Sequence, residues 1–117
     1  MAAVALNTFK TIRKKVTTSE ETVYTCPIGV ATIVLFAQVT NVDPLDSTPN
    51  VTAIHSRSTE VTTDFKFANQ VPIPPNDTAS LVPDGRLVLE TGDVIKISGS
   101  SNNTMDLILS ILETAKQ

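Results

Sequence analysis

The sequence is poor in the residues that most often build catalytic or stacking sites. It contains one cysteine, one histidine, one tyrosine and no tryptophan. A single cysteine, Cys26, excludes a disulfide within the chain and a cysteine-rich zinc site. With His55 as the only histidine, no pair of histidines can bind a metal ion. Because aromatic side chains are scarce, a stacking surface for bases or sugars has little support.

Other absences exclude further classes of function. The net charge of −3 gives no general reason to expect a nucleic-acid partner. The longest apolar run, residues 30–37, is interrupted by Thr32 and is too short to span a membrane. No glycine-rich phosphate loop, Cys-x-x-Cys motif or His-Glu-x-x-His motif occurs. We therefore expect no enzymatic activity, no cofactor, no metal site, no nucleic acid and no membrane partner.

The remaining candidates for chemistry have simpler interpretations as structural residues. His55 lies in an alternating stretch, and we predict a partly exposed residue of a strand. Cys26 precedes a proline and has no basic neighbour, so we predict a buried, inert thiol, which suits a protein made in a reducing cytoplasm. Asp43 and Asp46 share one loop, but two carboxylates are too few to predict a calcium site.

What the sequence does contain is a long stretch typical of a central strand, at residues 21–39. A β-prone run leads to a Pro-Ile-Gly sequence, and a longer run rich in β-branched residues follows. Pro27 has a fixed φ and Gly29 can adopt the positive φ of a tight turn, so we predict a hairpin. Both alternating faces of residues 30–39 are largely apolar. We therefore predict a central strand that is buried on both sides.

The rest of the chain has the pattern of short strands separated by turns. Three prolines exclude a central strand at residues 70–77, and Pro-Asp-Gly predicts a turn at residues 83–85. Thr-Gly-Asp predicts a second tight turn, in which Gly92 supplies the positive φ and the Asp93 carboxylate bonds its own backbone. Alternation predicts further strands at residues 50–58, 61–68, 86–89 and 94–98.

Residues 104–115 fit two interpretations. Leu107, Ile108, Ile111 and Leu112 have helical spacing, and leucine and methionine favour a helix. Met105 and the alternate residues after it form one apolar face of a strand instead. Because every other element is short and regularly spaced, we predict a strand that completes a sheet.

These elements predict an all-β protein, an antiparallel β-sandwich of jelly-roll type with about seven to nine short strands. A length of 117 residues suits one domain with one core. We expect residues 16–117 to form this domain. Residues 1–15 are expected to form either an N-terminal arm or an edge strand.

The N-terminal segment carries the best candidates for contact with a partner. As an arm, it would insert Phe9 and Ile12 into an apolar groove, while Arg13 and Lys15 pair with carboxylates at the rim. As an edge strand, it would pair within its own subunit and be protected by its lysines. Four of the nine basic residues lie here: Lys10, Arg13, Lys14 and Lys15.

Four stretches, in this order, resemble motifs of small bacteriophage virion proteins, common among phages of cyanobacteria and other aquatic bacteria. They cover most of the chain and comprise Thr22-Val-Tyr-Thr-Cys-Pro-Ile-Gly-Val-Ala-Thr-Ile-Val, Val71-Pro-Ile-Pro-Pro-Asn, Leu87-Val-Leu-Glu-Thr-Gly-Asp-Val-Ile and Ser110-Ile-Leu-Glu. Two positions depart from the pattern: Val30 stands where a polar residue is common, and Ile111 where an aromatic one is.

The resemblance implies a structural module of the virion, made in the host bacterial cytoplasm, and not an enzyme. Its expected role is a capsid decoration or cement protein that clamps neighbouring capsomers. The implied partners are the major capsid protein or other virion proteins, and the implied state is a homo-oligomer, preferably a trimer. The alternative is a component of the tail, neck or fibre. A carbohydrate-binding sandwich is disfavoured because the chain has no tryptophan and only Tyr24 as tyrosine.

Overall fold

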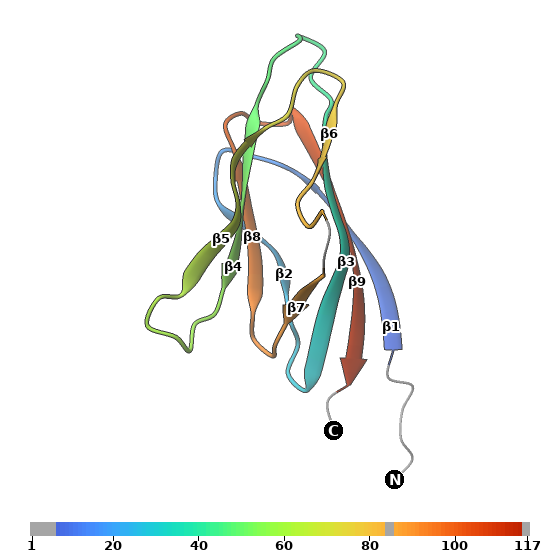
Figure 1. The fold of residues 1–117 in the computed structure, drawn as a ribbon, viewed down its shortest axis with the longest axis vertical. Helices are drawn as coiled ribbons and strands as arrows, with labels where there is room; N and C mark the ends of the chain where they lie inside the picture. The colour runs from blue at the N-terminus through green and yellow to red at the C-terminus, as the bar shows by residue number, and fades with distance from the viewer. Residues whose placement is uncertain (1–6, 84–85, 116–117) are drawn as a thin grey trace.

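A computed structural model describes residues 7–83 and 86–115 of the chain. These residues form nine strands in two antiparallel sheets that pack face to face in an elongated molecule of 56 × 31 × 23 Å (Figure 1). They contain no helix that is long and apolar enough to cross a membrane. The predicted all-β sandwich is therefore confirmed.

We call the five-stranded sheet sheet A and the four-stranded sheet sheet B. Sheet A has the order β1 (Asn7–Lys15), β9 (Met105–Ala115), β3 (Val30–Asn41) and β6 (Thr78–Ser80), and β7 (Leu87–Leu89) also pairs with β3. Sheet B has the order β2 (Glu21–Thr25), β8 (Val94–Gly99), β4 (Asn50–Ser56) and β5 (Asp64–Pro72).

The pairing of the strands is nested. β4 pairs with β5, β3 with β6, β2 with β8 and β1 with β9. The chain is therefore one long antiparallel hairpin that is wrapped into two sheets, which is the arrangement of a jelly roll. Figure 1 shows the result, with sheet B on the left and sheet A on the right.

β9 shows why the strand interpretation of residues 104–115 is right. Met105, Leu107, Leu109 and Ile111 are buried, whereas Ile108 is exposed. β9 pairs with β1 on one side and β3 on the other, so its backbone is bonded along both edges. These neighbours outweigh the helical preference of leucine, because packing normally decides against weak local propensities.

β3 is central, as predicted, but the prediction that it is buried on both sides is wrong. Its inner face packs into the core through Thr32, Val34 and Val39. Its outer face exposes 38% of Leu35 and 40% of Phe36. The pairing with β9 shifts between Val34 and Phe36, so a bulge changes which residues face outward. A two-layer sandwich covers only one face of each strand, and an apolar composition by itself does not supply a third layer.

The predicted hairpin at Pro27 is also wrong, because β2 and β3 belong to different sheets. The turn itself exists: the Val30 N–H donates to the Pro27 carbonyl at 3.3 Å, and Gly29 has a φ of 78°. In a nested hairpin, consecutive strands leave one sheet for the other. The Pro-Ile-Gly turn therefore makes a corner between the sheets.

The second predicted turn lies beside this corner. The Asp93 N–H donates to the Glu90 carbonyl at 2.9 Å, and Gly92 has a φ of 87°. Cys26 bonds both residues of this turn: its N–H donates to Asp93 O at 2.8 Å, and its carbonyl accepts from the Gly92 N–H at 2.9 Å. The two glycine turns thus support each other where the chain passes between the sheets.

The described part of the N-terminal segment, residues 7–15, forms β1 at the edge of sheet A. β1 pairs with β9 over its whole length, from Asn7 opposite Thr114 to Lys15 opposite Asp106. Residues 1–6, which contain the apolar start of the expected arm, lie outside the described residues, as do Asp84 and Gly85 of the expected Pro-Asp-Gly turn.

Candidate functional site: the outer face of sheet A

The outer face of sheet A carries apolar side chains in a straight line across four strands. Phe9 of β1 pairs with Leu112 of β9, Leu112 with Ile33 of β3, and Ile33 with Val88 of β7. Directly paired residues in an antiparallel sheet lie on the same face, so these four residues form one row. Phe9 is 71% exposed and Val88 55% exposed. We call these four residues the apolar row.

Further apolar residues extend the surface next to the row. Leu35 and Phe36 stand at the bulge of β3, and Ile108 is 43% exposed on β9. Two shallow hollows adjoin Ile108. One, of about 230 Å³, is lined by Phe36, Gln38, Thr40, Val42, Asp106 and Ile108, and the other, of about 390 Å³, by Arg13, Lys14, Lys15, Asp106 and Ile108. Contiguous exposed apolar surface of this kind typically marks a site of contact with another protein.

Three of the four residues that the sequence suggested for partner binding lie on this face. Phe9 belongs to the apolar row, and Arg13 and Lys15 pair with Ile108 and Asp106 farther along β9. Ile12 lies on the opposite face of β1, where it packs against the core. The structure therefore brings Phe9, Arg13 and Lys15 together and separates Ile12 from them.

Most of the basic cluster on β1 is paired within the subunit. In each pair a lysine Nζ atom lies close to a carboxylate oxygen. The distance is 3.0 Å from Lys10 to Glu113, 3.1 Å from Lys14 to Glu21 and 2.6 Å from Lys15 to Asp106. Arg13 is exposed and has no ion pair with any residue in the described ranges. Of the four cations, Arg13 is the one that is ready to pair with a carboxylate of a partner.

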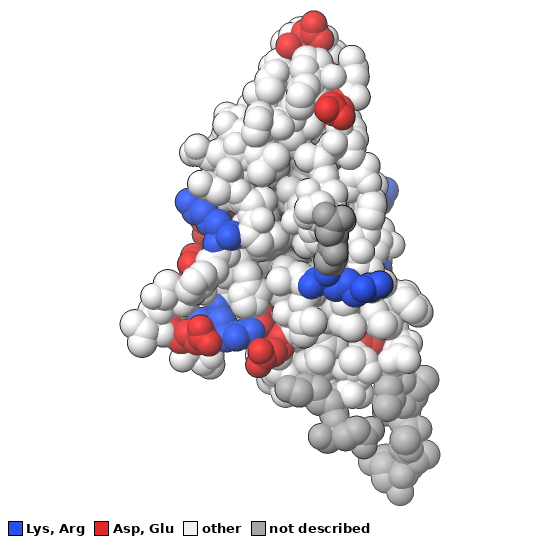
Figure 2. Space-filling model, viewed as in Figure 1, with Lys and Arg blue, Asp and Glu red and all other residues white. Residues whose placement is uncertain are grey.

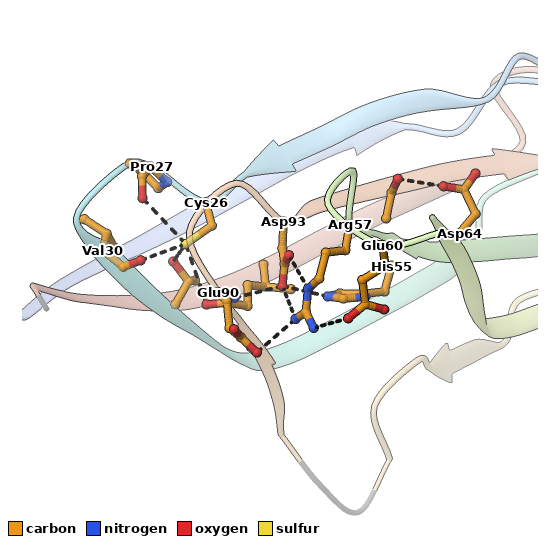
Figure 3. Close-up of polar contacts among 12 residues, drawn as sticks. Cys26, Pro27, Val30, His55, Arg57, Glu60, Asp64, Glu90 and Asp93 are labelled. Atoms are coloured by element: carbon orange, nitrogen blue, oxygen red, sulfur yellow. Dashed lines mark hydrogen bonds and ion pairs between the residues drawn. The ribbon is translucent and has the colours of Figure 1, made fainter. Parts of the chain in front are cut away.

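A second polar cluster surrounds Asp93 at one end of sheet B (Figure 3). Asp93 is 1% exposed, and Arg57 donates to both of its carboxylate oxygens, at 2.8 and 2.6 Å. His55 Nε2 lies 2.9 Å from the same carboxylate, which also accepts the Glu90 N–H at 2.9 Å. Figure 2 shows basic and acidic side chains side by side at this end of the sheet.

The Asp93 cluster joins the turn before β8 to the end of β4, because Asp93 bonds both the Glu90 N–H of its own turn and the Arg57 side chain. The Arg57 guanidinium, followed by the Glu90 backbone and His55, holds the pKa of Asp93 well below its usual range. A carboxylate that is kept ionised in this way is a poor proton acceptor. The bond from Asp93 to its own turn was predicted from the sequence, whereas the contacts of Arg57 and His55 with Asp93 were not. Their spacing of two residues on an alternating strand was the available signal, since it places both side chains on one face.

A third cluster links the two sheets through buried side chains. The Tyr24 hydroxyl of β2 bonds Thr32 of β3 at 2.8 Å and donates to Glu113 of β9, which also pairs with Lys10 of β1. The Tyr24 hydroxyl and then Lys10 lower the pKa of Glu113, while burial next to Glu113 raises the pKa of Tyr24. Tyr24 is therefore a cross-link inside the sandwich and offers no stacking surface.

The remaining candidates from the sequence have structural partners. Cys26 is 1% exposed, with its sulfur 3.2 Å from the Val30 carbonyl oxygen. Asp43 accepts the Leu45 N–H at 3.0 Å and the Ser47 hydroxyl, so it holds its own loop. In the ranges that the structure describes, no three histidine, cysteine, aspartate or glutamate residues are grouped so as to hold a metal ion.

Comparisons with known proteins identify the fold. No family model matches the sequence, and no curated protein sequence does. A chain in the structure of the disulfide-linked pili of Bacillus endospore appendages is 13% identical, with 99% of this chain and 98% of that chain covered and a TM-score of 0.52. A chain in the acid-stable capsid of Helicobacter pylori bacteriophage KHP30 is 9% identical, with 97% and 90% covered and a TM-score of 0.53. At these identities, the structural similarity shows only that the three chains share a fold over nearly their whole length.

Proposed function

We propose that this protein is a non-enzymatic structural protein of a phage virion, a capsid decoration or cement protein that stabilises the shell by clamping neighbouring capsomers. The observation that carries the proposal is the outer face of sheet A, where the apolar row and Arg13 form an exposed surface suited to another protein. The motifs that resemble phage virion proteins support it. So does the fold shared with a chain of a phage capsid, because nearly the whole of both chains is covered.

The proposed contact has apolar anchors and a charged margin. Phe9 and Val88, the most exposed members of the apolar row, pack against an apolar area of the major capsid protein or another virion protein. Arg13 pairs with a carboxylate of the partner, and its planar guanidinium suits a bidentate contact. Charges at a margin are screened by salt, so most of the binding free energy comes from the apolar anchors. Ile12 takes no part, because it packs inward.

In this role the protein is made in the host bacterial cytoplasm and resides in the virion. The resemblance implies that it acts as a homo-oligomer, with a trimer as the preferred state. The partners are the major capsid protein or other virion proteins, with no nucleic acid and no membrane.

A component of the tail, neck or fibre is the second candidate, favoured by the fold shared with a chain of a pilus. A disulfide-linked assembly is not supported for this chain. A covalent polymer needs at least two cysteines in each subunit, whereas these 117 residues contain one, which is 1% exposed. A fibre of this protein would therefore depend on non-covalent contacts.

The copy number in purified particles distinguishes the two candidates. Quantitative mass spectrometry should find a number of copies close to that of the major capsid protein, and the protein should bind to tailless shells. A few copies that separate with the tail would support the second candidate, and absence from the particle would contradict both.

A pair of variants tests the surface itself. Burial of a phenylalanine contributes about 2 kcal/mol, so Phe9→Ser should weaken binding to shells by about tenfold or more. Phe65→Ser is the matched control, because Phe65 is 60% exposed but belongs to sheet B. Equal effects of the two substitutions would contradict the assignment to sheet A.

A further inference from the structure

The edges of the two sheets differ in how well they are protected against pairing with another chain. β6 and β7 have three residues each, and β2 has five, with a register shift between Thr22 and Tyr24. β5 has two register shifts against β4, a positive φ at Gln70 and a proline at its end. Short strands, bulges and prolines are the devices that keep sheet edges from pairing.

β1 lacks these three devices. It has nine residues, seven of them exposed, and its register with β9 is unbroken from end to end. Its backbone groups on the side away from β9 can therefore accept a strand of full length. Its protection consists of its cations, of which three are already paired within the subunit. A second strand can pair with β1 if it places no cation directly opposite the cations of β1.

We propose that β1 pairs antiparallel with β1 of a second copy of this chain, around a twofold axis at Thr11. An axis perpendicular to the sheet keeps the inner face of each copy on the inside, and it joins the two A sheets into one continuous sheet. Thr11 is the middle residue of β1, so all nine residues pair. Because directly opposed residues share a face, the axis must pass through a residue pair of this kind.

The distribution of charge selects this register. With the axis at Thr11, Lys10 lies opposite the partner's Ile12, and Lys14 opposite the partner's Thr8. An axis at Lys10 would oppose two copies of Lys10, and an axis at Ile12 would oppose Lys10 and the partner's Lys14. Like charges directly opposite each other are destabilising. An axis at Phe9 avoids such pairs but leaves only residues 7–11 overlapping.

The selected register also gives the two most available groups of β1 a partner. Phe9, 71% exposed, lies opposite the partner's Arg13 on the outer face, and the pair occurs twice in the dimer. A guanidinium over an aromatic ring makes a favourable cation–π contact. This contact covers one face of the ring and leaves the outer edge of Phe9 and the in-plane N–H groups of Arg13 open to the virion protein proposed above. The dimer would present two A faces side by side, which is a suitable shape for bridging two capsomers. The dimer does not depend on the proposed function, and it replaces the trimer that the resemblance implies as the state in solution.

Cysteine cross-linking and light scattering test the twofold axis. At an antiparallel pair the Cα atoms are about 4.5–5.5 Å apart, which a disulfide can span. In a Cys26→Ala background, mild oxidation should convert Thr11→Cys into a covalent dimer. Thr8→Cys is the matched control, because its two copies would lie about 20 Å apart along the strands and should not cross-link.

The full chain should have twice the 12.5 kDa mass of one subunit at micromolar concentration. Thr11→Lys places two lysines on the axis and should raise the dissociation constant at least tenfold, whereas Thr22→Lys on β2 should leave it unchanged. A monomer or a trimer of the unaltered chain would overturn the proposal. So would a dimer that neither cross-links through Thr11→Cys nor weakens in Thr11→Lys.

Discussion

The outer faces of the two sheets have opposite compositions at equivalent places. Across sheet A, paired residues form the row Phe9, Leu112, Ile33 and Val88. Across sheet B, the corresponding pairs form the row Thr22, Lys96, Ile54 and Lys66. Ile54 is only 4% exposed, whereas Phe9 is 71% exposed. Ile54 lies on an inner strand between Lys96 and Lys66, whereas Phe9 lies on an edge strand. Long charged side chains such as lysine cover apolar neighbours while their charges stay in water.

The comparison shows that the two sheets differ in the surface and the edges that they expose. On sheet B the charge of Lys96 is paired within the subunit, since its Nζ atom lies within 3.8 Å of carboxylate oxygens of both Glu20 and Asp64. The edge strands of sheet B are short or bulged. Sheet A has an apolar exterior and a long regular edge. Since exposed apolar surface gains free energy only when something covers it, sheet A is the side on which the proposed contacts lie. The following four predictions test this division, beginning with the largest effect.

Acidification should weaken both sheets at once. Asp93, in the turn before β8 of sheet B, and Glu113, in β9 of sheet A, have pKa values below the ordinary 3.8 and 4.5. A lowered pKa in the folded state stabilises the protein above the ordinary pKa, and this stabilisation is lost as the pH falls. The free energy of unfolding from urea titrations should be flat above about pH 6 and fall steadily below about pH 5. A constant value down to pH 3 would contradict the role of both carboxylates.

Removal of the Asp93 carboxylate should destabilise sheet B without touching the outer face of sheet A. Asp93→Ala leaves Arg57 without its main partner and removes a bond of the β7–β8 turn, so we expect a loss of about 3 kcal/mol in the free energy of unfolding. Glu20→Ala, which removes an exposed partner of Lys96, should change it by less than about 0.5 kcal/mol. Equal losses in the two variants would show that burial of the pair has no effect.

Valine in place of Gly29 or Gly92 should destabilise the turns at which the chain passes between the two sheets. Gly29 and Gly92 have positive φ, and a Cβ at either position would meet no atom within 4 Å. The cost of Gly29→Val or Gly92→Val therefore comes from the backbone alone, about 1 kcal/mol or somewhat more. Asparagine tolerates this conformation better, so Gly29→Asn should cost less than Gly29→Val in the same thermal or urea unfolding measurement. A larger cost for asparagine would exclude backbone strain as the cause.

Substitutions on the outer face of sheet A should have the smallest effect on stability, although this face has the largest proposed role in binding. Phe9→Ser and Phe65→Ser change exposed side chains, so each should alter the free energy of unfolding by about 0.5 kcal/mol or less. Only Phe9→Ser should reduce binding to shells and self-association. If Phe9→Ser destabilised the isolated chain by several kcal/mol, Phe9 would be a core residue, and the contrast between the two sheets would not hold.

The sequence by itself determined the features that depend on neighbouring residues. Alternation indicated the strands at residues 50–58 and 94–98, and the glycines at positions 29 and 92 indicated turns. The bond of Asp93 to its own turn was likewise predictable. Each of these follows from the local period of a strand or from the φ that a turn requires, so no knowledge of distant segments is needed. Together they were sufficient to predict an all-β sandwich.

Only the tertiary structure decided which distant residues meet. The apolar row combines positions 9, 33, 88 and 112, and it depends on the register of three strand pairs. The bulge at Phe36, the pairing of Arg57 with Asp93 and the passage of the chain between sheets at Pro27 depend on register and topology in the same way. A shift of one residue moves every side chain of a strand to the other face, and register is set by packing across the whole core rather than by local sequence. For this reason the strands could be predicted from the sequence, whereas the surface that they form together could not.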